Sequence, residues 1–245
     1  MENHSQGVKN QSATSESSTA KVASKIITSF LWFLFAANVA YLFSFFPTIP
    51  ELGYENIFRV NGFTILIWTT VTFFGALVST YASNYLKGFR YHLNFMLLCL
   101  AFTMSVMLFV ASEHVALLLG SWLMMGIVMA KLIGVDAQWL EAREASKFTL
   151  KYFMTGTLFL SIGVLLLAFQ SDMYTVSGIV ASMDELPMYI LSIAAVCIIV
   201  AAIVQSAIYP FHRWLLSAMT APTPASALMH AGFVNGAGIL LTLFS

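Results

Sequence analysis

The stretch that decides the fold is residues 209–238, YPFHRWLLSAMTAPTPASALMHAGFVNGAG. It holds three prolines, two histidines and an arginine, whereas the segments before it are long runs of Leu, Ile, Val, Phe and Met. Pro210 lacks an amide hydrogen, and in a continuous helix its ring would collide with the carbonyl of Ser206. We therefore predict that the helix leading into this stretch kinks or breaks at Pro210.

The composition of the chain is that of an integral membrane protein. Of the 245 residues, 59% are hydrophobic and 9% are charged, against roughly 25% charged residues in a typical soluble domain. The formal net charge is zero, so no overall basic field indicates nucleic acid as a partner. Cys99 and Cys197 each lie inside an apolar run with no second ligand nearby, and we interpret both as buried core. We expect no cofactor and no bound metal.

Seven apolar segments have the length that a helix needs to cross about 30 Å of hydrocarbon. Their approximate bounds are residues 25–47, 60–82, 92–112, 115–134, 149–169, 188–210 and 224–244. This pattern predicts an all-α integral membrane fold with about seven transmembrane helices, one of them broken at Pro210. Membrane lipid is then the medium around the chain.

The distribution of basic residues predicts the orientation. Nine lysines and arginines fall at the end of the spans where the N-terminus lies, and only Arg59 falls at the opposite end. The positive-inside rule then places the N-terminus in the cytoplasm. Residues 1–22 are rich in Ser, Thr, Asn and Gln and are predicted to be a disordered cytoplasmic tail. Residues 23–245 remain as the transmembrane helical domain.

Few charged side chains fall inside the spans, and each is a candidate functional residue because charge is costly in hydrocarbon. Lys131 lies a few residues from the cytoplasmic end of its span. Its long stem either carries the ammonium to the headgroups or places it in a buried functional site, and both interpretations stay open. Glu113 and His114 lie in a short external turn, and we predict that they are solvated rather than part of an ion path.

The segment after Pro210 supplies further candidates. Residues 211–220 form an amphipathic helical piece. If this piece completes the crossing, Gln205 lies near the centre of one discontinuous span; if it lies along the interface, Gln205 is close to the membrane edge. Ser226 and His230 are four residues apart on one helix face, so the hydroxyl can orient the imidazole. Neutral imidazole can relay a proton; the alternative is a histidine satisfied by a nearby carbonyl.

Residues 205–232, QSAIYPFHRWLLSAMTAPTPASALMHAG, resemble the signature of the antiporter-like membrane subunits of respiratory complex I and Mrp-type cation/proton antiporters. In that family a proton-relay lysine precedes Ser-Ala, a broken helix follows, and PTP-x-SAL-x-HA opens the next helix with a conducting histidine. Weaker likeness upstream extends the similarity over roughly residues 57–245. The resemblance implies a proton path. Its expected members are His230, Gln205, Ser206, Ser226 and Lys131.

Within this family, the tail HAGFVNGAG (residues 230–238) is most similar to the membrane subunit of the DAB-type inorganic carbon pump. That likeness implies a transport subunit, not itself an enzyme, which couples cation or proton movement to uptake of CO2 or bicarbonate across a bacterial inner membrane. It also implies a partner, a soluble zinc-binding subunit related to carbonic anhydrase. Two alternatives remain open: a proton-translocating subunit of NADH-quinone oxidoreductase or an Mrp-type antiporter, and a non-conducting docking module.

Two positions depart from the family pattern. The relay lysine falls at Gln205, and the glutamate that follows a tryptophan in the fifth helix falls at Leu123, after Trp122. Losing both groups together is physically coherent, because one buried charge without its partner is costly. An amide does not titrate, so protons moving through this half would pass by His230 and water, or by a route through Lys131.

The chain is also shorter than the family pattern. Family members contain two inverted five-helix repeats, each with its own broken helix, and the resemblance covers the first of them. We therefore expect a fragment or one half of a split subunit, with a second chain supplying the missing repeat.

Overall fold

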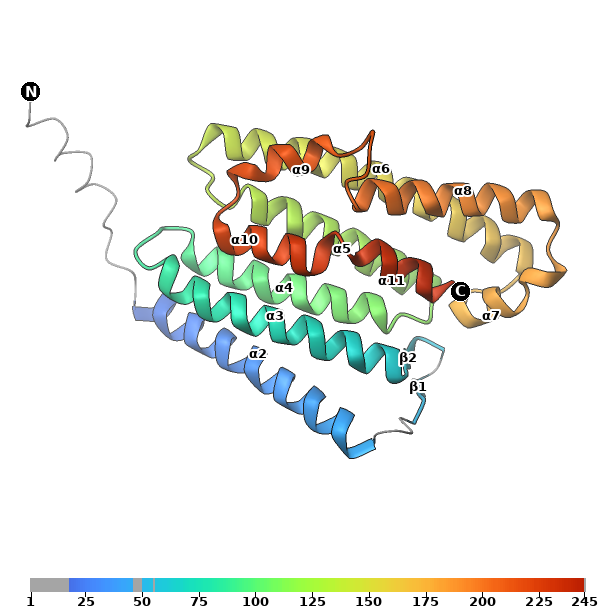
Figure 1. Ribbon diagram of the computed structural model, residues 1–245, viewed down its shortest axis with the longest axis horizontal. Coiled ribbons are helices and arrows are strands. Elements are labelled where there is room, and N and C mark those ends of the chain that lie inside the picture. The colour runs from blue at the N-terminus through green and yellow to red at the C-terminus, as the bar shows by residue number, and fades with distance from the viewer. Residues whose placement is uncertain (1–17, 46–49, 55, 245) are drawn as a thin grey trace, which may run out of the picture.

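The computed structural model describes residues 18–45, 50–54 and 56–244, and Figure 1 shows these as a bundle of helices with a short hairpin at one end. Elements carry the labels of Figure 1; η1 and η2 are 3-10 helices and η3 is a π-helix. In chain order they are α2 (Ser18–Phe45), β1 (Leu52–Tyr54), β2 (Phe58–Val60), α3 (Gly62–Tyr85), α4 (His92–Val110), α5 (Val115–Ile133), α6 (Leu140–Ser171), α7 (Val176–Ala181), η1 (Met183–Glu185), α8 (Met188–Gln205), α9 (Arg213–Ser217), η2 (Ala218–Thr220), α10 (Thr223–Leu228), η3 (Met229–Phe233) and α11 (Gly236–Leu243).

Seven helical stretches of the described chain are long and apolar enough to cross a membrane, which confirms the predicted all-α, multi-pass fold. They are Ala20–Phe45, Gly62–Tyr85, His92–Val110, Val115–Ile133, Leu140–Ser171, Met188–Gln205 and Thr223–Leu243. Each coincides with one predicted segment, although α6 begins at Leu140 and not near residue 149. The sequence LEAREASK before the apolar run consists largely of good helix formers, so the helix continues beyond the part that hydropathy detects.

The tail predicted over residues 1–22 lies mainly outside the described residues. Its last part, residues 18–22, belongs to α2, so the predicted domain boundary falls inside a helix. Ala20, Lys21 and Ala23 favour helix, and they extend α2 past the apolar run in the same way as the start of α6.

Helices that follow one another in the chain pack side by side. α2 contacts α3, α3 contacts α4, α4 contacts α5 and α5 contacts α6, while α8 packs along α6. The last crossing, made of α10, η3 and α11, lies over this layer and contacts α3, α4, α5 and α8 (Figure 1). Any irregularity in the last crossing is therefore placed among several other helices.

Two glycines of α6 set the distance to α8. A Cβ at Gly163 would lie 3.0 Å from the carbonyl oxygen of Ala194 and 3.1 Å from the Cβ of Cys197, and a Cβ at Gly156 would lie 3.2 Å from a methyl of Val204. Small residues of this kind let helix backbones approach closely in membranes. These close contacts on α6 help to set where α8 lies along α6 and which of its faces meets α6. They therefore also help to position Gln205 at the end of α8.

We expect Gly163→Ala to lower the free energy of unfolding by about 1–3 kcal/mol, since the added methyl presses on backbone that cannot rotate away. The matched control is Gly120→Ala on α5, where a Cβ meets nothing within 4 Å and the gain in helix propensity is up to about 1 kcal/mol. Thermal unfolding of the purified chain in detergent measures both. Equal midpoints for the two variants would contradict the close-packed α6–α8 contact.

Candidate functional site

Helix α8 ends at Gln205 in a C-terminal capping motif, in which amides of the following residues donate hydrogen bonds to carbonyls of the last turn. The amide of Ile208 donates to the carbonyl of Ile203 (3.1 Å) and the amide of Ala207 donates to the carbonyl of Val204 (3.3 Å). Ala207 adopts the left-handed conformation that this motif requires, with φ 53°. The predicted interruption is thus confirmed; it begins at Ser206, and Pro210 lies exposed within the non-helical link of residues 206–212.

The chain beyond the link continues the crossing. Figure 1 shows α9 extending past the end of α8 in the same direction along α6, and α9 and η2 both contact α6. Trp214 of α9 is fully buried, and its indole Nε1 donates to the carbonyl of Val204 across the link, at 2.9 Å. Of the two interpretations of residues 211–220, the arrangement favours the discontinuous span.

The last crossing is irregular at the same level. The π-turn Met229–Phe233 closes with the amide of Val234 donating to the carbonyl of Met229, five residues earlier, at 3.1 Å. Single π-turns inside helices occur frequently at functional sites. The sequence did not predict this π-turn. Prolines occur only at the start of the helix, and the glycines at 232 and 236 are equally compatible with an α-helix.

Side chains at the end of α8 bond to the main chain of this π-turn. Gln205 Nε2 donates to the carbonyl of Phe233 at 3.3 Å, and Ser206 Oγ donates to the carbonyl of Val234 at 3.2 Å. Gln205 is 3% exposed. Because Phe233 lies near the middle of the Thr223–Leu243 crossing, Gln205 lies at mid-depth. We refer to these two side chains and the two carbonyls as the junction.

Aromatic rings enclose the junction on one side. The ring centroid of Phe153 lies 4.8 Å from that of Trp214, at an interplanar angle of 72°, and 4.5 Å from that of Phe233. Gly236 leaves room on another side, since a Cβ there would lie 3.4 Å from Met125 Cε and 3.7 Å from Gln205 Nε2. The polar contacts are therefore held in a tightly packed apolar surround.

The other predicted site residues lie apart from the junction. His230 is exposed, and among the described residues no hydrogen bond joins its imidazole to the part-buried Ser226 or to Gln205 or Ser206. Lys131 is exposed in the last turn of α5, as the headgroup interpretation expects. The structure thus brings together Gln205 and Ser206 from the predicted set.

His212 is a candidate that the sequence did not single out. It lies in the link, its ring stacks on that of Tyr209 with centroids 5.8 Å apart, and its Nδ1 is buried without a hydrogen-bond partner among the described residues. An imidazole can both donate and accept hydrogen bonds, so His212 is a polar candidate within the link. The sequence showed only a histidine on the polar side of an amphipathic piece, which gives no signal of burial.

The prediction that Glu113 is solvated is wrong. The side chain is 8% exposed, and its carboxylate accepts hydrogen bonds from the amide of Ser177 (3.0 Å) and from the Ser177 hydroxyl. A short turn in sequence suggested exposure, but the connection between α6 and α8 folds over it, and such a long-range contact has no local pattern. His114 is half-buried, and its Nδ1 accepts a hydrogen bond from the amide of Ala116.

The described residues contain no group of three or more His, Cys, Asp or Glu side chains placed to hold a metal ion. Seven crossings and an interrupted helix at mid-depth define a multi-pass membrane protein of the transporter type, in which broken helices surround ion or substrate sites.

Residues 111–245 match the family described as NADH:quinone oxidoreductase/Mrp antiporter, TM. The chain belongs to this family. Its fold is similar to that of a chain in the Mrp complex from a Dietzia species, with a TM-score of 0.74 and 23% identity over 91% of this chain and 27% of that one.

Several relatives carry names from different complexes. The chain is 33% identical over 79% of its length to a probable K+/H+ antiporter subunit of Rhizobium meliloti, of which it covers 19%. It is 30% identical over 71% of its length to the probable inorganic carbon transporter subunit DabB of Bacillus subtilis, covering 36%. It is 30% identical over 78% of its length to chloroplastic NAD(P)H-quinone oxidoreductase subunit 5 of Cichorium intybus, covering 26%. The chain thus spans about a fifth to a third of the length of these relatives.

We expect Trp214→Phe to lower the free energy of unfolding by about 2 kcal/mol or more, because the hydrogen bond to the Val204 carbonyl is lost and the smaller ring leaves a cavity in the core. Trp139→Phe is the matched control; Trp139 is 46% exposed, and its replacement should change stability by less than about 0.5 kcal/mol. Thermal unfolding in detergent compares them. Equal effects would show that the indole N–H does not stabilise the interrupted helix.

Proposed function

We propose that this antiporter-like subunit serves an energy-coupled uptake complex for inorganic carbon, in which cation or proton movement through the membrane drives a carbonic-anhydrase-like partner. Two lines of support converge. The segment HAGFVNGAG, residues 230–238, resembles the membrane subunit of that carbon pump. It contains Phe233, whose carbonyl accepts the hydrogen bond from Gln205. Relatives at 30% and 31% identity are named probable inorganic carbon transporter subunits.

The proposed route for protons passes the interrupted helix. Backbone that is not helical at membrane depth persists only where protein or water satisfies it, so the link of residues 206–212 is the natural place for water to enter. Gln205 and Ser206 supply hydrogen bonds but no charge, and the imidazoles of the link and of the π-turn are those of His212 and His230. In this proposal the imidazoles carry the proton, and the junction holds the two broken helices in register.

Polar side chains on the outer face of the last crossing support a protein partner in the membrane. His230 and Asn235 are exposed on this surface, and polar groups at membrane depth nearly always face protein or a water-filled cavity. We propose that membrane helices equivalent to the second repeat of the family cover this surface. The repeat would come from a second chain or from a longer form of this one.

The remaining parts of the proposal concern location and catalysis. We place the chain in a bacterial inner membrane with its N-terminus in the cytoplasm, as the basic residues indicate. Hydration of CO2 would occur in the soluble zinc-binding partner, because the described residues of this chain hold no cluster of metal ligands. The chain itself would act in transport.

A cation/proton antiporter is the second candidate. The relative at 33% identity is named a probable K+/H+ antiporter subunit, and such a role needs the same interrupted helix without the soluble partner. A non-conducting docking module is the third, favoured by a neutral amide at Gln205 and by Leu123, where the family pattern has a lysine and a glutamate.

The experiment is to express the chain with the products of its neighbouring genes and to measure energised bicarbonate uptake. We expect His230→Gln, which keeps hydrogen bonding but does not titrate, to lower the uptake rate by about tenfold or more. Ala227→Ser, at an exposed position one turn before His230, should leave the rate unchanged.

Three results would redirect the assignment. Unchanged uptake by His230→Gln in an assembled complex favours the docking module. Proton movement in vesicles that follows a Na+ or K+ pulse, without any effect of inorganic carbon, favours the antiporter. Failure of a zinc-binding soluble protein to co-purify with the chain contradicts the carbon pump.

A further inference from the structure

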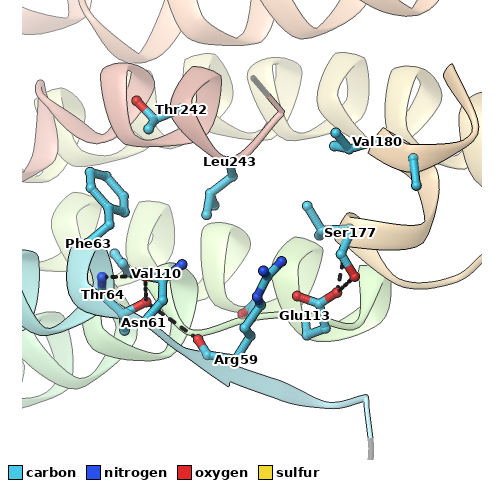
Figure 2. Close-up of a pocket in the computed structure, with 13 residues that line it drawn as sticks. Arg59, Asn61, Phe63, Thr64, Val110, Glu113, Ser177, Val180, Thr242 and Leu243 are labelled. Carbon is cyan, nitrogen blue, oxygen red and sulfur yellow. Dashed lines mark hydrogen bonds between the residues drawn. The ribbon is translucent and has the colours of Figure 1, made fainter. Parts of the chain in front are cut away.

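The two ends of the bundle differ in how their charges are balanced. The hairpin end holds a cavity of about 450 Å³, lined by residues of β2, the α4–α5 turn, α7 and α11. Figure 2 shows the charged side chains along its wall, Arg59 and Glu113, and the hydrogen bonds from Ser177 to the Glu113 carboxylate. One positive and one negative charge balance there. The opposite end, which the proposed orientation makes cytoplasmic, has no such balance along one face of α6.

This face of α6 is exposed over most of the length of the helix. Its members recur every three or four residues and therefore share one side; they are Lys147, Lys151, Met154, Leu158 and Ile162, and all are exposed. Arg143, four residues before Lys147, begins the same face and is exposed too. The face is thus basic at the start of α6 and apolar along its continuation.

Lys151 lies at the level where the hydrocarbon begins. Residues 152–169 contain no charged side chain, and the helix from Lys151 to Gln170 rises about 28 Å at 1.5 Å per residue. The hydrocarbon core is about 30 Å thick. Lys147 lies one turn further out, in the headgroup region. The two ammonium groups are therefore at the depth of lipid phosphates, and the apolar continuation is at the depth of acyl chains.

Helix α5 adds another cation at the same depth. The hydroxyl of Ser146 on α6 donates to the carbonyl of Ala130 on α5 at 2.6 Å, so these two residues lie at one level. The residues that follow them, Lys147 and Lys131, are both exposed. Basic side chains of two adjacent helices thus meet the membrane boundary together.

These cations have no acidic partner within the protein. Among the residues that the structure describes, no carboxylate lies within 4.0 Å of Arg143, Lys147, Lys151 or Lys131. Glu144 shares the exposed face, but it lies in the first turns of α6, farther from the hydrocarbon than Lys147. One carboxylate against the three cations of this face leaves a net charge of +2. Basic clusters beside the end of a membrane helix attract anionic headgroups.

We propose that this end of α5 and α6 is a binding site for an anionic phospholipid. The ammonium groups of Lys131, Lys147 and Lys151 hold the phosphate of the headgroup, and an acyl chain lies along the apolar continuation of the α6 face. A zwitterionic lipid is disfavoured because its choline or ethanolamine adds a positive charge beside the lysines. A soluble acidic protein would match the charge but could not reach the apolar continuation, which lies within the hydrocarbon.

The bound lipid would stabilise the helix on which the interrupted span rests. Helix α6 contacts α8, α9 and η2, and its glycines set the approach of α8. The exposed face carries the lipid while other faces of α6 carry these helices. The inference is independent of the proposed function, since it holds whichever ion or solute the complex transports.

The test measures thermal unfolding of the purified chain in detergent micelles that contain phosphatidylglycerol or phosphatidylcholine with the same acyl chains. A lipid that binds only the folded state raises the midpoint, and we expect a rise of about 3–5 °C in phosphatidylglycerol over phosphatidylcholine. Lys147→Gln and Lys151→Gln should each raise the mole fraction of phosphatidylglycerol that gives half of this shift, by about fivefold. Lys25→Gln is the matched control and should leave it unchanged, because Lys25 is exposed on α2, at the edge of the bundle opposite α6 (Figure 1).

Further arms separate a lipid site from general attraction and from a folding defect. Glycerol phosphate, which has the phosphate without acyl chains, should give no shift, and Lys151→Arg should retain the shift because it keeps the charge. In phosphatidylcholine the glutamine variants should unfold at the wild-type midpoint, since exposed substitutions change stability little. Equal wild-type midpoints in the two lipids overturn the proposal, as does an equal shift with glycerol phosphate. A loss in Lys25→Gln as large as that in Lys147→Gln also overturns it, because the attraction would then belong to the whole basic end.

Discussion

The structure depends on the requirement that backbone donors and acceptors be satisfied at membrane depth. Helix α8 stops at Gln205, and its last carbonyls are closed by the amides of Ala207 and Ile208 and by the indole of Trp214. The last crossing is irregular at the same level, and side chains from the end of α8 reach its carbonyls. Side chains at the end of one interrupted helix therefore bond to the main chain of the other. Each interruption is tolerated because the other lies beside it.

This arrangement explains why a neutral side chain suits position 205. The amide of Gln205 is 3% exposed, lies among aromatic rings and donates to a main-chain carbonyl. An ammonium buried at this position would need a counter-charge. The amide keeps the hydrogen-bonding role of the site without the cost of a buried unpaired charge. The junction thus joins the two interrupted helices through uncharged groups.

Sequence patterns predicted the parts of the fold that depend on local chemistry. Runs of apolar residues located all seven crossings, and Pro210 indicated the interruption. Both signals are local, because hydropathy and the missing amide hydrogen of proline are properties of the residues themselves. The π-turn at Met229–Phe233 was not predictable, since its hydrogen bond to the end of α8 and its contacts with α3 and α5 join residues far apart in the chain. Glu113 was misjudged for the same reason: the loop that buries it lies more than sixty residues away in the chain. The exposure of His230 likewise depends on tertiary placement, which helical spacing cannot report.

The charges associated with α5 lie at its two ends. Lys131 is exposed at one end of α5, and Glu113 and Arg59 line a cavity at the other. One face of α5 connects these regions: Ser121 contacts Ser112 below the cavity, and Met125, one turn further on, lies against Gly236 beside the junction. Methionine is flexible and adapts to irregular surroundings, so Met125 fills the space that Gly236 leaves beside Gln205.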